Sequence, residues 1–239
     1  MAAPTSLRHL DESARQARRS WARTFTGKAA VIRAGTVELP GELTVPPGAL
    51  GAVVFAHGSG SSRLSPRNRQ VARALHQSHL ATLLFDLLTP EEAFDRRNVF
   101  DIPLLAGRLG AARRWLRRQP EVAGLSVGCF GASTGAAAAL WAAAEPGARI
   151  SAIVSHGGRP DLAGERLSLV RAPTLLVVGG ADEVVLELNR EAFAQLRCEA
   201  DLAVVPGATH LFEEPGALER VSELAAAWFS EWLPLRSMG

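Results

Sequence analysis

The chain has 239 residues, a length that fits one large α/β domain or two small ones and that can bury a sizeable core. Its 26 basic and 24 acidic residues leave a formal net charge of +2, so charge gives no support for binding to nucleic acid or to an anionic membrane. The two cysteines are too few to form a disulfide framework.

The N-terminal segment predicts a solvated arm. Residues 1–20 lack the apolar core of a secretory signal, and they mix arginines with Asp11 and Glu12, whereas a transit peptide is poor in acids. No run approaches the ~20 apolar residues that span a bilayer. We therefore expect a soluble cytoplasmic protein with a helical or flexible arm over residues 1–27 and a single domain over 28–239.

The segments after the arm are typical of antiparallel edge strands. Residues 29–33 and 37–45 are short and partly alternating, and Pro40 and Gly41 interrupt the second of them.

Beyond Gly48, apolar runs alternate with amphipathic or Ala-rich segments. This alternation, with short connections, predicts a mostly parallel sheet covered by helices on both faces. The expected strands cover about 52–56, 81–85, 125–130, 149–154, 172–178 and 201–205. The expected helices cover about 66–79, 103–119, 134–144, 162–169, 186–196 and 216–232, and residues 89–98 are expected to form a polar loop.

The stretch 125–140 points to chemistry. Its apolar run ends at Gly131-Ala-Ser-Thr-Gly135, and an Ala-rich segment follows. Gly-x-Ser-x-Gly between a strand and a helix is typical of a nucleophile elbow, in which the tight turn lifts the serine hydroxyl clear of the backbone. The structural alternative is a Gly-rich turn. We interpret Ser133 as a nucleophile.

Two later residues fit as its partners. A serine hydroxyl needs a neutral imidazole to take its proton, and the imidazole needs a carboxylate to orient it. Asp182 follows an expected strand and a Gly-Gly pair, and His210 follows the last expected strand, in the order Ser, acid, His. Singly, Asp182 could be a helix N-cap and His210 a loop histidine. Together they predict a Ser133–Asp182–His210 triad.

An oxyanion hole needs two N–H groups aimed at the developing charge. Thr134, the residue after the nucleophile, is expected to supply one. The second is expected from Ser59, with Gly60 as the other choice. His57 comes too early in the chain for the base and is interpreted as a residue that orients the loop.

With these residues the chain resembles α/β-hydrolases of the dienelactone hydrolase-like group. The resemblance is to small bacterial members and rests on His57-Gly-Ser-Gly-Ser-Ser-Arg-Leu-Ser-Pro-Arg-Asn68, with similar stretches at 87–92 and 98–106. It covers roughly residues 28–233. It implies the α/β-hydrolase fold and the same triad.

One departure concerns the nucleophile. Dienelactone hydrolases proper use a cysteine, whereas this chain has Ser133, and Cys129 lies earlier, inside the expected strand. The fold carries over but the dienelactone substrate does not, which favours a serine carboxylesterase. The connection after the expected sixth strand is short, residues 155–168, so no large lid domain is expected.

Other polar residues have a functional and a structural interpretation. Arg63 or Arg67 could bind a carboxylate or phosphate of the substrate, or form an ion pair with Asp86, Glu91 or Asp101. His156 could touch substrate or bond to backbone. His76 and His79 have no third ligand in view, so no metal site is expected. No nucleotide-binding fingerprint occurs, so no cofactor is implied.

The expected function is hydrolysis of small esters, lactones or thioesters through an acyl-enzyme. Two alternatives remain: acyl transfer or perhydrolysis with the same triad, and a catalytically silent binding protein on the same fold. The expected partner is a small-molecule ester, with neither nucleic acid nor membrane, and the chain is expected to be a monomer or, through its apolar last helix, a homodimer.

Overall fold

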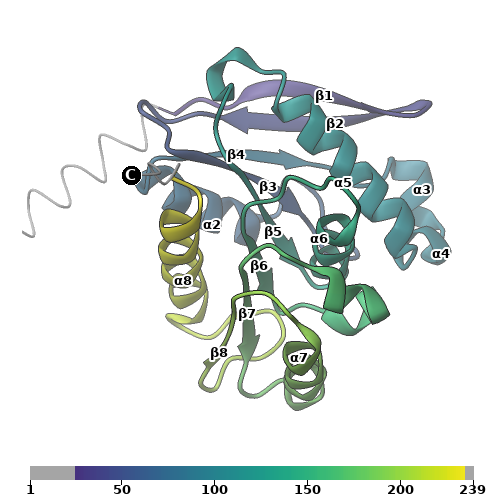
Figure 1. Cartoon of the computed structure of the whole chain (residues 1–239), viewed down its shortest axis with the longest axis vertical. Helices are drawn as coiled ribbons and strands as arrows, with labels where there is room; N and C mark the ends of the chain where they lie inside the picture. Colours follow the sequence, from purple (N-terminus) through teal and green to yellow (C-terminus); the bar gives the residue numbers. More distant parts are fainter. Residues whose placement is uncertain (1–24, 235–239) are drawn as a thin grey trace, which may run out of the picture.

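The structure, a computed structural model, describes residues 25–234 (Figure 1). Eight strands form one sheet in the order β1-β2-β4-β3-β5-β6-β7-β8. The β1–β2 and β2–β4 pairings are antiparallel, and all pairings from β4 through β3 to β8 are parallel. The strands are β1 (Lys28–Ala34), β2 (Val37–Thr44), β3 (Gly51–Ala56), β4 (Leu80–Phe85), β5 (Val127–Ala132), β6 (Ile153–His156), β7 (Thr174–Gly179) and β8 (Ala200–Val205). The predicted mostly parallel α/β architecture is confirmed, and the predicted arm lies almost wholly outside the described residues.

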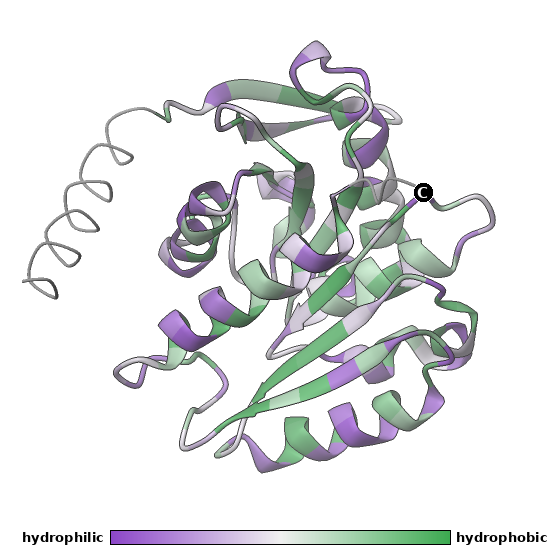
Figure 2. Cartoon of the chain, turned by 60° about the vertical axis from the view of Figure 1, so that its left-hand side comes forward, coloured by the Kyte–Doolittle hydropathy of each residue, from purple (hydrophilic) through white to green (hydrophobic). Residues whose placement is uncertain are grey.

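Helices cover both faces of the sheet (Figure 1). The main ones are α2 (Pro66–Gln77), α5 (Ile102–Leu116), α6 (Thr134–Ala144), α7 (Glu183–Gln195) and α8 (Ala217–Trp232). Strand β3 shows why both faces are covered: Val54 packs in the core under α5 and α6, whereas its neighbours Val53 and Phe55 pack in the core under α2 and α8. The strands are hydrophobic along most of their length, whereas hydrophilic and hydrophobic residues alternate along the surface helices (Figure 2). No helix within residues 25–234 is long and apolar enough to cross a membrane.

The loop predicted over 89–98 is instead two short helices, α3 (Pro90–Phe94) and α4 (Arg96–Val99). Thr89 begins α3 with a capping box: its hydroxyl accepts a hydrogen bond from the amide of Glu92, and the Glu92 carboxylate accepts one from the amide of Thr89. The prediction of a loop was wrong because helices this short have no apolar stripe and are marked by their caps alone.

Strand β6 begins later than predicted. The expected strand over 149–154 is Ile153–His156, because the ladder with β7 begins at the Ile153–Thr174 pair and continues to His156 opposite Val177. The short helix predicted over 162–169 is the 3₁₀ segment Pro160–Leu169, and a second 3₁₀ turn, Pro120–Val122, follows α5. The extension of β6 brings His156 level with Ala132, next to the predicted nucleophile.

The carboxyl ends of the parallel strands lie at one edge of the sheet, where open α/β sheets bind their ligands. His57 follows β3 and Ser133 follows β5, in the centre of the sheet. Asp182 follows β7 and His210 follows β8, at one margin. The topology therefore brings segments that are far apart in the sequence to one edge.

Candidate active site

Ser133 occupies a strained turn between β5 and α6. Its φ of 49° and ψ of −120° lie outside the regions that non-glycine residues usually adopt, so the surrounding structure must impose them. The Ser133 amide donates to the carbonyl of His156 at 3.2 Å. A Cβ at Gly135 would overlap the carbonyl oxygen of Ala56, and one at Gly131 would lie 2.5 Å from the Cα of Ala136. Both glycines are needed because the turn packs directly on its neighbours.

His210 and Asp182 form a short hydrogen bond, 2.7 Å between Nδ1 and Oδ2. The Asp182 side chain stands at the N-terminus of α7 but makes no capping bond there. Its carboxylate is thus committed to the imidazole rather than to the helix. In the tautomer that donates Nδ1–H to Asp182, Nε2 carries no proton and can accept one.

The loop after β3 is fixed by His57 and Arg63. His57 Nδ1 donates to the carbonyl of Gly58 at 2.9 Å, and its Nε2 accepts from the amide of Leu87 at 3.0 Å. Burial lowers the pKa of His57, which keeps the ring neutral for these bonds. The Arg63 amide and guanidinium both bind the carboxylate of Asp86, at 2.6 and 2.5 Å. Arg63 therefore has the structural ion pair that the sequence allowed, and it lines neither cavity of the site.

Two cavities at this edge share Gly58, Ser59 and Ser61 in their linings. The smaller, about 200 Å³, is lined by Ser133, His210 and Arg67. The larger, about 320 Å³, is lined by Thr134 together with the apolar side chains Leu87, Leu88, Ala93, Val99 and Leu105. Of the predicted oxyanion residues, Ser59 lines both cavities and Gly60 the larger one. Thr134 is the first residue of α6, where an amide N–H has no acceptor within the helix.

The two other predicted substrate contacts differ in accessibility. Arg67 is partly exposed, lines the smaller cavity, and its guanidinium lies 3.3 Å from the carboxylate of exposed Glu213. His156 also lines this cavity, but its ring is buried beside Phe130 and Phe212, with centroids 5.7 and 4.5 Å away. Burial, followed by the charges of Arg67 and His210, lowers the pKa of His156 to about 3, so the ring is neutral. Neither of its nitrogens has a hydrogen-bond partner within the described residues.

Sequence reasoning missed the apolar wall of the larger cavity. Leu87 and Leu88 follow β4, Val99 ends α4 and Leu105 belongs to α5, so no single pattern connects them. It also missed Asn189 of α7, whose amide donates to the carbonyls of Gly158 and Val185 at 3.0 and 2.7 Å. For the apolar wall, the one signal in the sequence was the apolar Leu87–Leu88 pair directly after the end of a strand.

Three further side chains lie away from this chemistry. Burial raises the pKa of the Cys129 thiol to about 12, so this cysteine in β5 is a packed apolar group rather than a nucleophile. His76 bonds to Thr82 Oγ1 at 2.8 Å, and His79 bonds to the carbonyl of Pro47 at 3.1 Å. The two histidines therefore have different partners.

The sequence of the chain matches a known protein family. A family model described as "Dienelactone hydrolase family" matches residues 69–234. Two Mycobacterium tuberculosis proteins, from strains CDC 1551 / Oshkosh and H37Rv, are each 62% identical over 202 residues, which is 84% of this chain. Both bear the name "Putative phosphoribosyl transferase". The match covers 46% of each, so the chain spans about half the length of these curated relatives.

Solved structures agree in fold. The crystal structure of a dienelactone hydrolase from Anabaena variabilis has a TM-score of 0.84 and 53% identity, and the match covers 88% of this chain and all of that one. Est1E from Butyrivibrio proteoclasticus has a TM-score of 0.73 at 17% identity, covering 86% of this chain and 98% of Est1E. The second likeness is one of fold alone.

Proposed function

Because the chain belongs to the dienelactone hydrolase family, we propose that it is a serine hydrolase that cleaves small carboxylic esters, lactones or thioesters. Family and fold support a hydrolase. The finer assignment depends on one arrangement: Ser133 on its strained turn shares a cavity with His210, whose other nitrogen is held by Asp182. Ser133, Asp182 and His210 are accordingly the proposed nucleophile, orienting acid and base.

In the acylation step, Ser133 Oγ attacks the acyl carbon while His210 Nε2 takes the hydroxyl proton. The carbonyl π pair moves to oxygen and forms a tetrahedral oxyanion. The proposed donors to this oxyanion are the amides of Thr134 and of Ser59, with Gly60 as the other choice for the second. The imidazolium then gives its proton to the leaving oxygen or sulfur, the bond to the leaving group breaks, and the acyl-enzyme remains.

Deacylation repeats the sequence with water. His210 takes a proton from water as the hydroxide attacks the ester carbon. The imidazolium then returns the proton to Ser133 Oγ, and a carboxylic acid leaves. The contact between His210 and Asp182 stabilises the imidazolium in both steps, and the proximity of Asp182 favours the required tautomer.

The two cavities support a model in which different parts of the substrate bind in each. The 320 Å³ cavity beside Thr134 has an apolar wall suited to a small aliphatic or aromatic part. The 200 Å³ cavity is more polar, and Arg67 is its cation. Arg67 is the proposed contact for a substrate carboxylate, and Arg63 is assigned to its ion pair with Asp86. Buried His156 is assigned to the shape of the smaller cavity.

The name of the mycobacterial relatives raises a second candidate, transfer of a phosphoribosyl group. That name describes proteins about twice the length of this match. The candidate is tested by supplying a phosphoribosyl diphosphate and nucleobases and by measuring release of pyrophosphate. Release that persists in Ser133→Ala at the wild-type rate would favour the second candidate over the first.

The proposed hydrolase is tested by intact-mass analysis after treatment with a fluorophosphonate. An activated serine attacks phosphorus, fluoride leaves, and the protein gains one phosphonyl group. We expect one adduct on the wild type and none on Ser133→Ala. The matched control is Ser168→Ala, whose exposed hydroxyl donates to the carbonyl of Glu165 and lines neither cavity of the site; it should label like wild type.

A panel of esters of graded length and charge completes the test. Ser133→Ala should lose ester turnover by at least about 10³-fold and keep the circular dichroism of the wild type. Unchanged turnover in that variant would refute the assignment of Ser133. A folded wild type that neither labels nor turns over any ester would favour the binding-protein alternative.

A further inference from the structure

A groove of about 470 Å³ lies between α5 and α6, at the opposite end of α6 from Ser133. Its floor is apolar, formed by Ala106 and Leu109 of α5, Ala142 of α6 and Ile150. A Cβ at Gly107 would meet nothing within 4 Å, so the absence of a side chain there keeps the groove open. A cavity of this size matches a small molecule rather than a protein segment.

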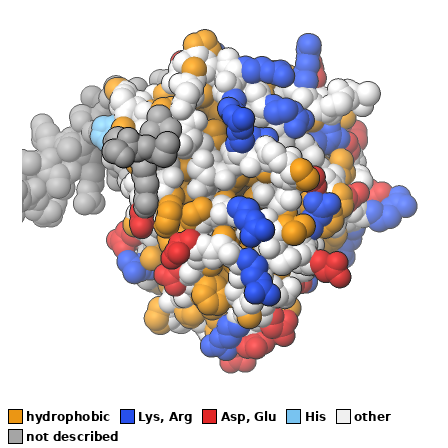
Figure 3. All heavy atoms as spheres, viewed as in Figure 1, with side chains coloured by type: hydrophobic (Ala, Val, Ile, Leu, Met, Phe, Trp, Pro, Cys, Tyr) orange, Lys and Arg blue, Asp and Glu red, His pale blue; other side chains and the backbone are white. Residues whose placement is uncertain are grey.

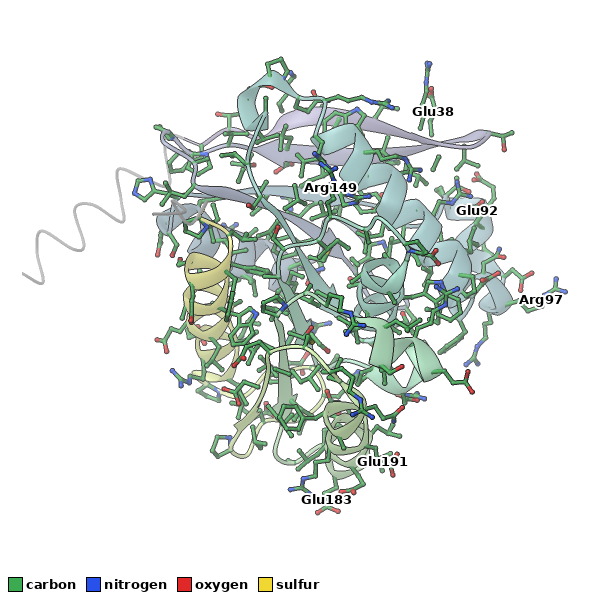
Figure 4. All side chains as sticks on the ribbon, viewed as in Figure 1. Glu38, Glu92, Arg97, Arg149, Glu183 and Glu191 are labelled. Atoms are coloured by element: carbon green, nitrogen blue, oxygen red, sulfur yellow. The ribbon has the colours of Figure 1, made fainter. Side chains whose placement is uncertain are left out.

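Arginines gather at one end of this groove. Arg113 and Arg114 line it, and Arg117 and Arg149 lie close enough to Arg113 to affect its pKa. Side chains of Lys and Arg crowd the upper part of the face in Figure 3, where Figure 1 places the C-terminal end of α5. Arg149 lies beside that end of the helix (Figure 4).

These four guanidinium groups, which we call the arginine cluster (Arg113, Arg114, Arg117 and Arg149), form no ion pair within residues 25–234. By contrast, Arg166 on the other rim binds Glu145 at 2.6 Å and lies 4.0 Å over the ring of Trp141. The dipole of α5 favours cations in its last turn, which accounts for three members. Arg149 belongs to a different segment, before β6, and the dipole of α5 does not explain its position.

The cluster is electrostatically unfavourable in the free protein. Burial lowers the pKa of Arg113, and the charges of Arg117, Arg114 and Arg149 lower it further. Arginine nevertheless stays charged, so the repulsion persists at neutral pH. An anion with several charges would relieve it, and guanidinium groups bind phosphate oxygens in pairs.

We propose that the α5–α6 groove binds a small phosphorylated molecule, whose multiply charged phosphate lies against Arg113, Arg114 and Arg149 and whose body lies on the apolar floor. This site is separate from the proposed hydrolase site, and binding there does not require Ser133. A carboxylate with a single charge would offset only one of the four cations, which is why the proposal specifies phosphate chemistry of higher charge.

The test uses inorganic pyrophosphate as the probe, with calorimetry and thermal unfolding at low salt. We expect saturable binding, a rise in Tm, and weaker binding of inorganic phosphate. The double variant Arg113→Gln/Arg114→Gln should bind pyrophosphate at least 10-fold more weakly. The control Arg190→Gln/Arg197→Gln removes the same charge from exposed positions on and after α7 and should bind like wild type.

A second variant, Ala148→Asp, places a carboxylate in the groove lining and should weaken binding without removing an arginine. The proposal is overturned if the wild type shows no saturable binding of pyrophosphate. It is equally overturned if the groove variants and the control lose affinity to the same extent. Ester hydrolysis measured in the same variants should stay at the wild-type rate, which separates this result from the proposed function.

Discussion

At the scale of single residues, two aspartates at helix starts differ in whether the side chain caps the helix. Asp182 stands at the start of α7 and forgoes the capping bond, whereas Asp101 at the start of α5 accepts a bond from the amide of Leu104 at 2.9 Å. The same residue type at the same kind of position therefore has two uses. One stabilises a helix and the other holds an imidazole.

The difference predicts opposite effects of substitution. Asp182→Asn should reduce kcat for ester hydrolysis by about 10⁴-fold, because the amide favours the wrong tautomer of His210, and should leave the free energy of unfolding nearly unchanged. Asp101→Ala should lower the free energy of unfolding by about 1 kcal/mol and leave kcat unchanged. Steady-state kinetics and urea titration check both. Equal kcat values for Asp182→Asn and wild type would exclude Asp182 from the triad.

Arg67 allows a test of substrate charge. If this guanidinium binds a substrate carboxylate, Arg67→Ala should lower kcat/KM for an anionic ester by at least about 10-fold, since a charge-assisted bond contributes about 1.5–3 kcal/mol. The matched neutral ester should be hydrolysed as by wild type. Glu213→Ala, which removes the exposed partner of Arg67, should leave or raise turnover of the anionic ester. Equal losses for both esters in Arg67→Ala would rule out the carboxylate contact.

At the scale of elements, Arg108 of α5 connects three parts of the fold. Its guanidinium donates to the carbonyl of Ala34 in β1 at 2.6 Å and to the carboxylate of Glu92 in α3 at 2.7 Å, and its side chain is 10% exposed. Helix α3 carries Ala93, which lines the larger cavity. Arg108 thus fixes one wall of the site from outside it.

Replacing Arg108 with Met should lower the free energy of unfolding by about 2–4 kcal/mol, because Glu92 is left half-buried without its cation. KM for esters with an apolar part in the larger cavity should rise as the wall loosens. Arg97→Met is the matched control: Arg97 pairs with Asp95 at 2.7 Å, but its side chain is 91% exposed and extends away from the protein in Figure 4, so neither stability nor KM should change. Identical losses in the two variants would contradict the anchoring role of Arg108.

Some of the secondary-structure elements were predictable from the sequence and others were not. The buried strands and the tight turn at Ser133 were predictable because apolar runs of strand length and Gly-x-Ser-x-Gly each have one local cause. The capped helix at Thr89 was missed, although Thr89, Pro90 and Glu92 together mark a helix start. The end of β6 depended on register with β5 and β7, which a local pattern does not contain.

The contacts of the site were less predictable than its residue types. Order along the chain and strand ends led to Ser133, Asp182 and His210 as candidates. Whether Arg63 meets Asp86 or a ligand is decided by the approach of two loops that follow β3 and β4. The apolar wall of the larger cavity likewise forms only when the loop after β4 packs together with α3, α4 and α5.

At the scale of the whole molecule, the buried histidines predict sensitivity to acid. Burial lowers the pKa of His76 to about 4 and that of His156 to about 3, below the value near 6.5 of an unfolded histidine. Between these values the unfolded chain binds more protons than the native protein. The contribution of the two neutral rings to the free energy of unfolding is therefore fully present above pH 6.5. It is lost as the pH falls toward 3, at up to about 1.4 kcal/mol per pH unit for each ring.

Urea titrations between pH 7 and pH 4 measure this slope. His156→Phe places an apolar ring beside Phe130 and Phe212. It should reduce the slope of the free energy of unfolding against pH by up to about 1.4 kcal/mol per pH unit, the effect of one proton. A variant with the full wild-type slope would show that His156 does not contribute to the acid sensitivity.

The positions of the proposed triad residues also determine the order in which they are synthesised and folded. Ser133 follows the central strand β5, whereas His210 follows the marginal strand β8 and comes 77 residues later. At roughly 5–20 residues per second on the ribosome, about 4–15 s separate the synthesis of the two. A nascent chain that already has its elbow would stay inert toward esters until the last strand joins β7. The proposed activity would therefore report when β8 joins the sheet on each newly made chain.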